Sequence, residues 1–327
     1  MPLRSESLQR VRQTANSSSL RSVRLPHSGA TLATAKVALI GNPNTGKTTL
    51  FNVLTGMSQR VGNYPGVTVE RKSGSVNLPD GTRAELFDLP GTYSLAAASP
   101  DEMIAVDVLL DDTESRRVDA VIAIVDAGNL RRNLYLVSQI LETGRPVVIA
   151  LNMTDVATAR GIHIDAIGLS NRLGVPVIPI SAQRRQGIDE LRVALADVLA
   201  GPLQKPALTP LPDDLQRQVT RLVQWSSGND RSVHGARPLV AAEALRAIVD
   251  QEGATEARLV AEGTPDATGV LAGMRAAVGA SQPLSALESD ARYNWVQQML
   301  EGTVTQSDEL SASRSDRVDR VLTHRLV

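Results

Sequence analysis

The stretch Gly41-Asn42-Pro43-Asn44-Thr45-Gly46-Lys47-Thr48 decides the fold of this 327-residue chain. It follows the short apolar run Val37–Ile40 and opens Thr48–Leu54, a segment typical of a helix. The spacing G-x-x-x-x-G-K-[ST] between a strand and a helix is that of a phosphate-binding loop, or P-loop. Its backbone N–H groups can point at phosphate oxygens, and the helix N-terminus adds partial positive charge. The sequence therefore predicts a nucleotide phosphate site, against the alternative of a purely structural glycine turn.

The chemistry of the loop residues suggests their roles. Lys47 can reach the β- and γ-phosphates, and Thr48 can place its hydroxyl on Mg²⁺. We expect further nucleotide contacts from the rest of the loop and the residue after it, namely Gly41, Asn42, Pro43, Asn44, Thr45, Gly46 and Thr49.

Outside the loop, short β-rich runs alternate with helix-like stretches. The strand-like runs are Val37–Ile40, Ala84–Phe87, Ala120–Val125, Val147–Leu151 and Val175–Ile180. The helix-like stretches are Thr48–Leu54, Pro100–Leu110, Leu130–Glu142, Ile164–Leu173 and Ile188–Leu199. Together with the P-loop, this alternation predicts an α/β fold with a mostly parallel sheet and helices on both faces. Thr68–Leu78 is expected as an additional, antiparallel edge strand.

A second phosphate-side motif, Asp88-Leu89-Pro90-Gly91, follows the strand-like run Ala84–Phe87. Asp88 at a strand end can hold Mg²⁺ through water, and the Gly91 N–H can sense the γ-phosphate. The motif alone is weak and usually marks a turn, but its place after the P-loop and at a strand end makes it good evidence.

The stretch Asn152-Met153-Thr154-Asp155 indicates which base is bound. An ionised carboxylate only accepts hydrogen bonds, so Asp155 can pair with the two donors on one edge of guanine and repel adenine. Asn152 would tie this loop to the P-loop and contact the base. Met153 and the dipeptide Ser181-Ala182 complete the expected base site. A plain Asn/Asp turn is the alternative for the isolated motif.

The loop Val61–Glu70 contains the candidate switch residue Thr68. A threonine here can close over Mg²⁺ and the γ-phosphate only while both are present, which would make the loop a switch. The alternative is a threonine that merely begins a strand. Lys47, Thr68 and Gly91 are thus expected catalytic groups, and Thr48, Thr68 and Asp88 are the expected Mg²⁺ ligands.

These strings together carry a family resemblance. GNPNTGKTTLFN (41–52), GNYPGVTVE (62–70), DLPGTYSL (88–95) and NMTD (152–155) closely resemble the cytosolic G domain of the ferrous iron transport protein B (FeoB) family. The second and third strings are far more specific than general GTPase motifs. The resemblance is strong over about 36–200 and implies a GTPase that switches between GTP and GDP states to gate or drive Fe²⁺ uptake at the cytoplasmic face of the cell membrane.

The resemblance also has consequences for catalysis. Thr92, not glutamine, follows Gly91, so the residue with which Ras-like GTPases orient water is missing and the intrinsic rate should be slow. The family is similar to potassium-stimulated GTPases with an asparagine at the fourth P-loop position, here Asn44. A K⁺ held by Asn44 could stabilise transition-state charge. An asparagine that only braces the loop is the alternative.

The rest of the chain is expected to divide as follows. Residues 1–35 are rich in Ser and Arg and suggest a disordered extension, with a transit peptide as the alternative. After the G domain (36–200), a proline-rich linker (201–212) precedes a helical domain (213–302) with no strand pattern. The resemblance suggests that this domain tunes GDP release, like a GDP-dissociation inhibitor. It also suggests that 303–327 leads to a membrane permease portion that the chain lacks.

Composition excludes several classes of protein. The chain has no cysteine and a formal charge of −1, which excludes thiolate metal sites and argues against nucleic-acid binding by bulk charge. Its longest apolar runs are far shorter than the roughly 18–20 residues of a membrane helix. The four histidines are too dispersed for a metal site: His27, His163, His234 and His324.

Two other functions share the same loops. A ribosome- or RNA-associated GTPase would usually carry a basic module, whereas residues 201–327 have 13 basic and 16 acidic side chains, a net charge of 13 − 16 = −3. A non-catalytic nucleotide-binding regulator is the other alternative. The expected partners are the permease portion, a small FeoA-like regulatory protein and a second copy of the chain, and no nucleic acid.

Overall fold

The computed structural model describes residues 34–56, 59–63, 70–96, 99–110, 117–201, 204–227, 239–261, 266–279 and 282–306. All of these belong to one compact unit of the chain. Thr68, most of the N-terminal extension and the end of the chain lie outside the described residues. Within the described part, no helix has both the length and the apolar character needed to cross a bilayer.

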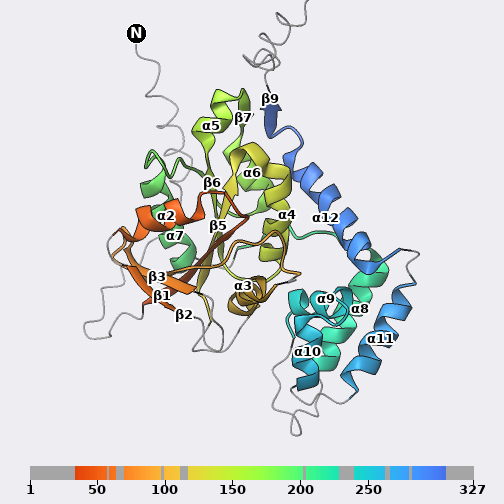
Figure 1. The fold of residues 1–327 in the computed structure, drawn as a ribbon. Helices are drawn as coiled ribbons and strands as arrows, with labels where there is room; N and C mark the ends of the chain where they lie inside the picture. The colour runs from red at the N-terminus through yellow and green to blue at the C-terminus, as the bar shows by residue number, and fades with distance from the viewer. Residues whose placement is uncertain are drawn as a thin grey trace, which may run out of the picture. The chain divides into compact units, whose positions relative to one another are not determined.

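A seven-stranded sheet in the order β2-β3-β4-β1-β5-β6-β8 forms the centre of the fold (Figure 1). The central strand β1 (Ala35–Gly41) runs parallel to β4 (Arg83–Asp88) on one side and β5 (Ala120–Asp126) on the other. Parallel strands β6 (Val147–Asn152) and β8 (Val177–Pro179) continue the sheet beyond β5. β6 is buried throughout and β1 and β5 nearly so, as their continuous apolar sequences predict.

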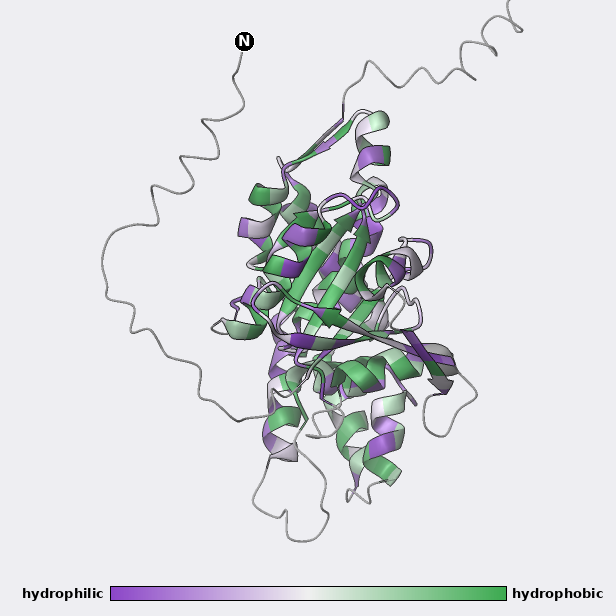
Figure 2. Cartoon of the chain, turned by 90° about the vertical axis from the view of Figure 1, so that its left-hand side faces the viewer, coloured by the Kyte–Doolittle hydropathy of each residue, from purple (hydrophilic) through white to green (hydrophobic). Residues whose placement is uncertain are grey.

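Helices cover both faces of this sheet, and the apolar strands between them are visible in Figure 2. One face packs against α2 (Lys47–Thr55) and α7 (Ile188–Ala200). The other packs against α3 (Pro100–Leu110), α4 (Leu130–Leu141) and α6 (Ala166–Leu173). The expected P-loop GTPase fold, with a mostly parallel sheet covered on both sides, is confirmed.

The edge of the sheet differs from the prediction. β3 (Glu70–Asn77) is antiparallel to β4, but it is an internal strand because β2 (Gln59–Asn63) pairs outside it. Every residue of β2 is exposed. A strand without buried side chains has no apolar period, which is why the sequence did not reveal it.

The sequence analysis also did not predict a small second sheet. β7 (Ile162–Ile164) pairs antiparallel with β9 (Val304–Gln306). Each strand has three residues, too few for an alternating pattern. The remaining short elements that the sequence did not predict are α5 (Thr154–Ala159) and a 3₁₀ turn, η1 (Ala127–Asn129).

In the described residues after 212, five helices fall into two groups. α8 (Asp213–Ser226), α9 (Ala241–Val249), α10 (Ala254–Ala261) and α11 (Ala267–Val278) surround an apolar cluster of their own. α12 (Leu284–Leu300) packs along α4 and contributes Trp295 and Val296 to the core under the sheet. It therefore belongs to the packing of both parts.

A fully buried arginine fixes α12 to α4. The Arg292 side chain is 0% exposed and donates to both carboxylate oxygens of Glu142 at 2.7 and 2.9 Å, and through Nε to Glu288 at 2.7 Å. Burial raises the pKa of Glu142 above its ordinary value, although Arg292 opposes this. Burial also disfavours ionised Glu288, yet Arg246 and Arg292 hold its pKa below the ordinary value. Removing the arginine would leave Glu142 without its main counter-ion and would leave Glu288 paired with Arg246 alone.

We expect Arg292→Met to lower the free energy of unfolding by about 3–5 kcal/mol, the usual cost of leaving one side of a buried ion pair uncompensated. The loss should be largest near pH 7.5 and shrink toward pH 5. Without Arg292 the pKa of Glu142 in the folded state rises further above its value in the unfolded state. The ionised carboxylate then destabilises the folded protein at pH values above the unfolded pKa. This destabilisation fades as the pH falls and the carboxyl is protonated. Urea unfolding at the two pH values measures this. Arg217→Ala, which breaks an exposed pair with Asp214 on α8, should cost less than about 1 kcal/mol. Equal losses in the two variants would contradict the account.

Candidate nucleotide site

The predicted motifs meet at one edge of the sheet because the strands that carry them are parallel. β1 ends at Gly41, β4 at Asp88, β6 at Asn152 and β8 at Pro179, and all four carboxyl ends lie on the same side. Ligands of open α/β sheets bind outside such carboxyl ends. The sheet thus brings together the P-loop, the Asp88 loop and the two base-side loops.

Backbone geometry shapes the P-loop between β1 and α2. Asn44 has φ +66° and Gly46 has φ +85°, so two residues adopt the left-handed conformation just before the helix. A Cβ on Gly46 would also collide with the amide of Asn152, so only glycine fits there. Thr45 is buried and its hydroxyl donates to the Asn42 carbonyl at 2.8 Å. These contacts fix the backbone of the loop where it leads into the N-terminus of α2.

The side chain of Asn42 is 3% exposed, and neither of its amide atoms has a hydrogen-bond partner among the described residues. A buried amide normally has at least one partner. A ligand, a water or a residue outside the described set must therefore supply it.

Lys47 and Asp88 form an ion pair at the phosphate end of the site, with Lys47 Nζ on Asp88 Oδ1. Both side chains are mostly buried, at 14% and 8% exposure. The contact places the Asp88 carboxylate beside the first turn of α2, where Thr48 and Thr49 are exposed. A hydroxyl and a carboxylate, completed by phosphate and water oxygens, are a donor set that fits Mg²⁺.

The Asp88 loop lies directly against the P-loop. A Cβ built on Gly91 would be 3.4 Å from the Pro43 nitrogen, and the Thr92 N–H donates to the Gly41 carbonyl at 3.3 Å. Thr92 itself is fully buried, and its hydroxyl lies 2.6 Å from the Ser94 carbonyl and 3.1 Å from Glu102 Oε1. The hydroxyl of Thr92, the residue after Gly91, thus has its hydrogen-bond partners inside the protein.

Asn152 connects three loops through one side chain. Its Nδ2 donates to the Thr45 carbonyl at 2.8 Å, and its Oδ1 accepts from the Ala182 N–H at 2.9 Å. The residue is 3% exposed and Ser181 is 2% exposed. The P-loop and both base-side loops therefore have fixed relative positions.

Asp155 lies in the first turn of α5. Met153, the residue just before this helix, has the left-handed conformation with φ +61°. The Thr154 hydroxyl anchors the turn by donating to the Ile180 carbonyl at 2.9 Å. The Asp155 carboxylate faces Arg184, whose Nε is 2.9 Å from its Oδ2. The sequence analysis did not single out Arg184, because an arginine in a polar loop has no signature of its own.

A second residue outside the motifs also supports the site. The Gln139 side chain of α4 accepts the Leu95 N–H at 2.7 Å and is 2% exposed. It holds the segment that follows the Asp88 loop. Only the fold reveals this role, because 44 residues separate the two partners.

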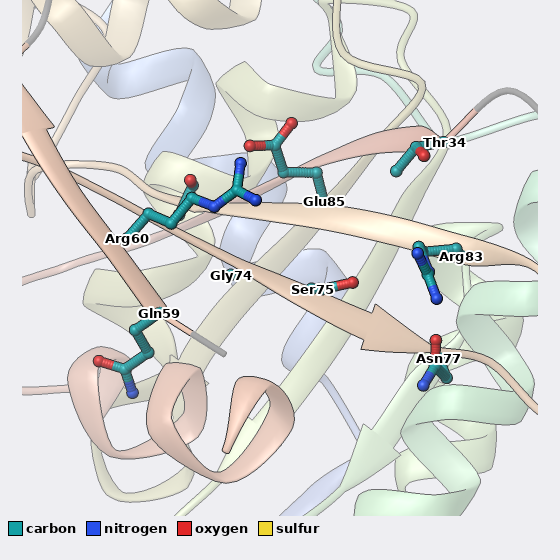
Figure 3. A pocket seen from close by; sticks show the side chains of 9 residues that line it. Thr34, Gln59, Arg60, Gly74, Ser75, Asn77, Arg83 and Glu85 are labelled. Carbon is teal, nitrogen blue, oxygen red and sulfur yellow. The ribbon is translucent and has the colours of Figure 1, made fainter. Parts of the chain in front are cut away.

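A polar hollow of about 570 Å³ lies elsewhere, on the face of β2, β3 and β4 (Figure 3). Ser73 and Ser75 of β3 line it together with Arg60, Arg83 and Glu85 of the neighbouring strands. It contains none of the motif residues. Among the described residues, moreover, no group of three or more His, Cys, Asp or Glu is arranged to hold a metal. The chemistry of the motifs belongs to the carboxyl edge of the sheet.

The fold and its loops define the class of the protein: a P-loop GTPase domain followed by helices. A family model described as ferrous iron transport protein B matches residues 35–195. The cytosolic domain of L. pneumophila FeoB is 37% identical with a TM-score of 0.69, covering 83% of this chain and 100% of that one. The GMPPNP form of the T. maritima FeoB cytosolic domain is 30% identical with a TM-score of 0.69, covering 83% and 100%.

The curated relatives are longer. The Fe(2+) transporter FeoB of Salmonella typhimurium is 52% identical over 163 residues, which are 49% of this chain and 20% of that protein. The Escherichia coli K12 transporter gives the same figures. This chain belongs to the ferrous iron transport protein B family, and it spans about a fifth of the length of these relatives.

We expect Asn152→Ala to destabilise the nucleotide-free protein by about 1–3 kcal/mol, since it leaves the Thr45 carbonyl and the Ala182 N–H unpaired and buried. Thermal or urea unfolding without nucleotide measures this. Gln59→Ala, which removes an exposed amide on β2, is the matched control and should change stability by less than about 0.5 kcal/mol. If Asn152→Ala were as stable as wild type, Asn152 would not hold the loops together.

Proposed function

We propose that this chain is the GTP-binding and GTP-hydrolysing module of a ferrous iron uptake transporter. The observation that carries the proposal is the convergence of four loops, joined by Asn152 and the Lys47–Asp88 pair, in a member of this family. A T. maritima relative is described in a GMPPNP form and an S. thermophilus relative bound to GDP. Both support a guanine nucleotide at the corresponding place.

The phosphates and the base of the nucleotide would bind at opposite ends of this edge of the sheet. At the phosphate end, the P-loop backbone and the N-terminus of α2 receive the phosphates, and Lys47 moves from Asp88 to a β- or γ-phosphate oxygen. At the base end, Asp155 accepts from the guanine N1–H and amine, and the Ala182 N–H region faces the guanine O6. Asn152 keeps the two ends in register.

Mg²⁺ would be held by Thr48 and, through water, Asp88, and would neutralise phosphate charge. Thr68, outside the described residues, is the proposed ligand that joins only in the GTP state. In hydrolysis a water oxygen bonds to the γ-phosphorus while the bond to the β–γ bridging oxygen breaks, giving GDP and phosphate. Lys47 and the Gly91 N–H stabilise the developing charge.

The cellular role rests on the family. We propose that the helical segment 213–302 tunes GDP release, and that GTP and GDP states gate or drive Fe²⁺ passage through a membrane permease portion. The module would then work at the cytoplasmic face of the cell membrane, with a FeoA-like protein or a second copy as further partners. The net charge of −3 over residues 201–327 disfavours the RNA-associated alternative.

The test of the nucleotide assignment is Asp155→Asn. The change removes an acceptor pair and should weaken GTP and GDP binding by about 2–4 kcal/mol. An asparagine amide offers one donor and one acceptor, which matches the N1–H and O2 of xanthine. The variant should therefore gain xanthosine diphosphate as a ligand, a change that misfolding cannot produce. Fluorescence titrations with GDP, GTP, ATP and xanthosine diphosphate measure both effects. Equal affinity of the wild type for GTP and ATP would refute the assignment.

Potassium dependence tests the role of Asn44, whose side chain is exposed at the tip of the P-loop. Hydrolysis should be about tenfold faster in K⁺ than in Na⁺ at equal ionic strength, which corresponds to about 1.4 kcal/mol of barrier. Asn44→Gly should abolish the difference and keep GDP binding. Glycine is the better probe than alanine because φ at this position is +66°. If wild type hydrolyses GTP equally in both salts, Asn44 only braces the loop.

A further inference from the structure

Arg184 lies against the carboxylate on which guanine recognition depends in the proposed function. Its Nε is 2.9 Å from Oδ2 of Asp155. The acid is 16% exposed and the arginine side chain 64% exposed, so Arg184 covers Asp155 from the solvent side. In the proposed function, the guanine base pairs with this same carboxylate.

The position of Arg184 is built into the turn that carries it. Ser181 and Gln186 exchange two backbone hydrogen bonds of 3.1 Å across the turn, and the Arg184 N–H donates to the Ser181 carbonyl at 3.1 Å. The same turn is fastened to the base loop, since the Ala182 N–H donates to Asn152 at 2.9 Å. Arg184 therefore starts from a fixed backbone next to Asp155.

Guanine and Arg184 offer Asp155 the same kind of group. The N1–H and N2 amine of guanine are paired donors, and the guanidinium also presents only donors. A bidentate base needs both oxygens of Asp155, and the Arg184 contact falls on one of them. We propose that Arg184 is an internal counter-ion that holds Asp155 while the base is absent and yields it to guanine, and so lowers the affinity for guanine nucleotides.

The size of the effect follows from exposure. Arg184 keeps most of its hydration when it leaves Asp155, so displacing it costs only the free energy of a partly exposed ion pair. Any interaction that stabilises the empty state alone weakens binding by the same factor. Pairs of this kind correspond to a factor of about two to five.

The test is the dissociation constant of methylanthraniloyl-GDP for wild type, Arg184→Ala and Arg184→Gln. Both variants should bind about two- to fivefold more tightly than wild type, and high salt should narrow the gap by screening the pair. The control is Arg192→Ala on α7, whose partner is the exposed Asp189 at 3.4 Å. It should leave the constant unchanged.

A second comparison isolates the Asp155 contact. In an Asp155→Asn background, with methylanthraniloyl-xanthosine diphosphate as the probe, removing Arg184 should change nothing, because no carboxylate remains to be held. Unchanged or weaker GDP binding by Arg184→Ala would overturn the inference, as would an equal effect of Arg184→Ala in the asparagine background. The inference rests on the proposed function, but the two fail differently: a wild type that binds no guanine nucleotide refutes the function, whereas one that binds GDP regardless of Arg184 refutes only this inference.

Discussion

The two hydrogen bonds of the buried Asn152 side-chain amide are the interaction on which the loops of the candidate nucleotide site depend. The amide donates to the P-loop at Thr45 and accepts from the turn at Ala182, so one side chain joins loops that lie 107 and 30 residues away in sequence. The parallel sheet brings these loops to the same edge, but strands alone leave their tips free. Because Gly46 has no Cβ, the P-loop backbone can approach the amide closely enough for the bond to form. The Asn152 hydrogen bond to the P-loop therefore requires glycine at position 46.

At each end of the site, an acidic side chain is paired with a basic side chain from another loop. Lys47 holds Asp88 at the phosphate end, and Arg184 holds Asp155 at the base end. Buried or half-buried charges are unfavourable without a partner, so these pairs stabilise the site in the absence of a ligand. In the proposed function, a nucleotide with its metal would replace both pairs, since phosphate suits the lysine, a cation suits Asp88 and guanine suits Asp155. Binding would then exchange one set of charge contacts for another, which would keep the net affinity well below the sum of the new contacts.

Most of the sheet and helix order could be predicted from the sequence, because the central strands are apolar throughout and the P-loop fixes a strand and a helix around it. The bounds of α3 (Pro100–Leu110) agree with the predicted ones. Elements without a burial pattern could not be predicted: β2 is wholly exposed, and β9 has three residues. The same holds for Arg184 and Gln139, whose importance comes from partners that only the fold brings near. The nucleotide roles of the motif residues stay predictions.

The helix α4 connects the nucleotide loops to the helices that follow them. Two consecutive residues of α4 face different partners: Gln139 accepts the Leu95 N–H, and the Ser138 hydroxyl lies 3.0 Å from Arg292 of α12. Both are buried, and the second amide atom of Gln139 has no partner among the described residues. If the segment after Gly91 moved and broke its bond to Gln139, the buried amide would lose its remaining partner, at a cost of about 1–3 kcal/mol. A rearrangement of that segment therefore either carries α4 with it or requires a compensating contact from the ligand. Arg292 fixes α12 to the same turn of α4. The position of α12 therefore depends on whether α4 moves with the segment or stays in place.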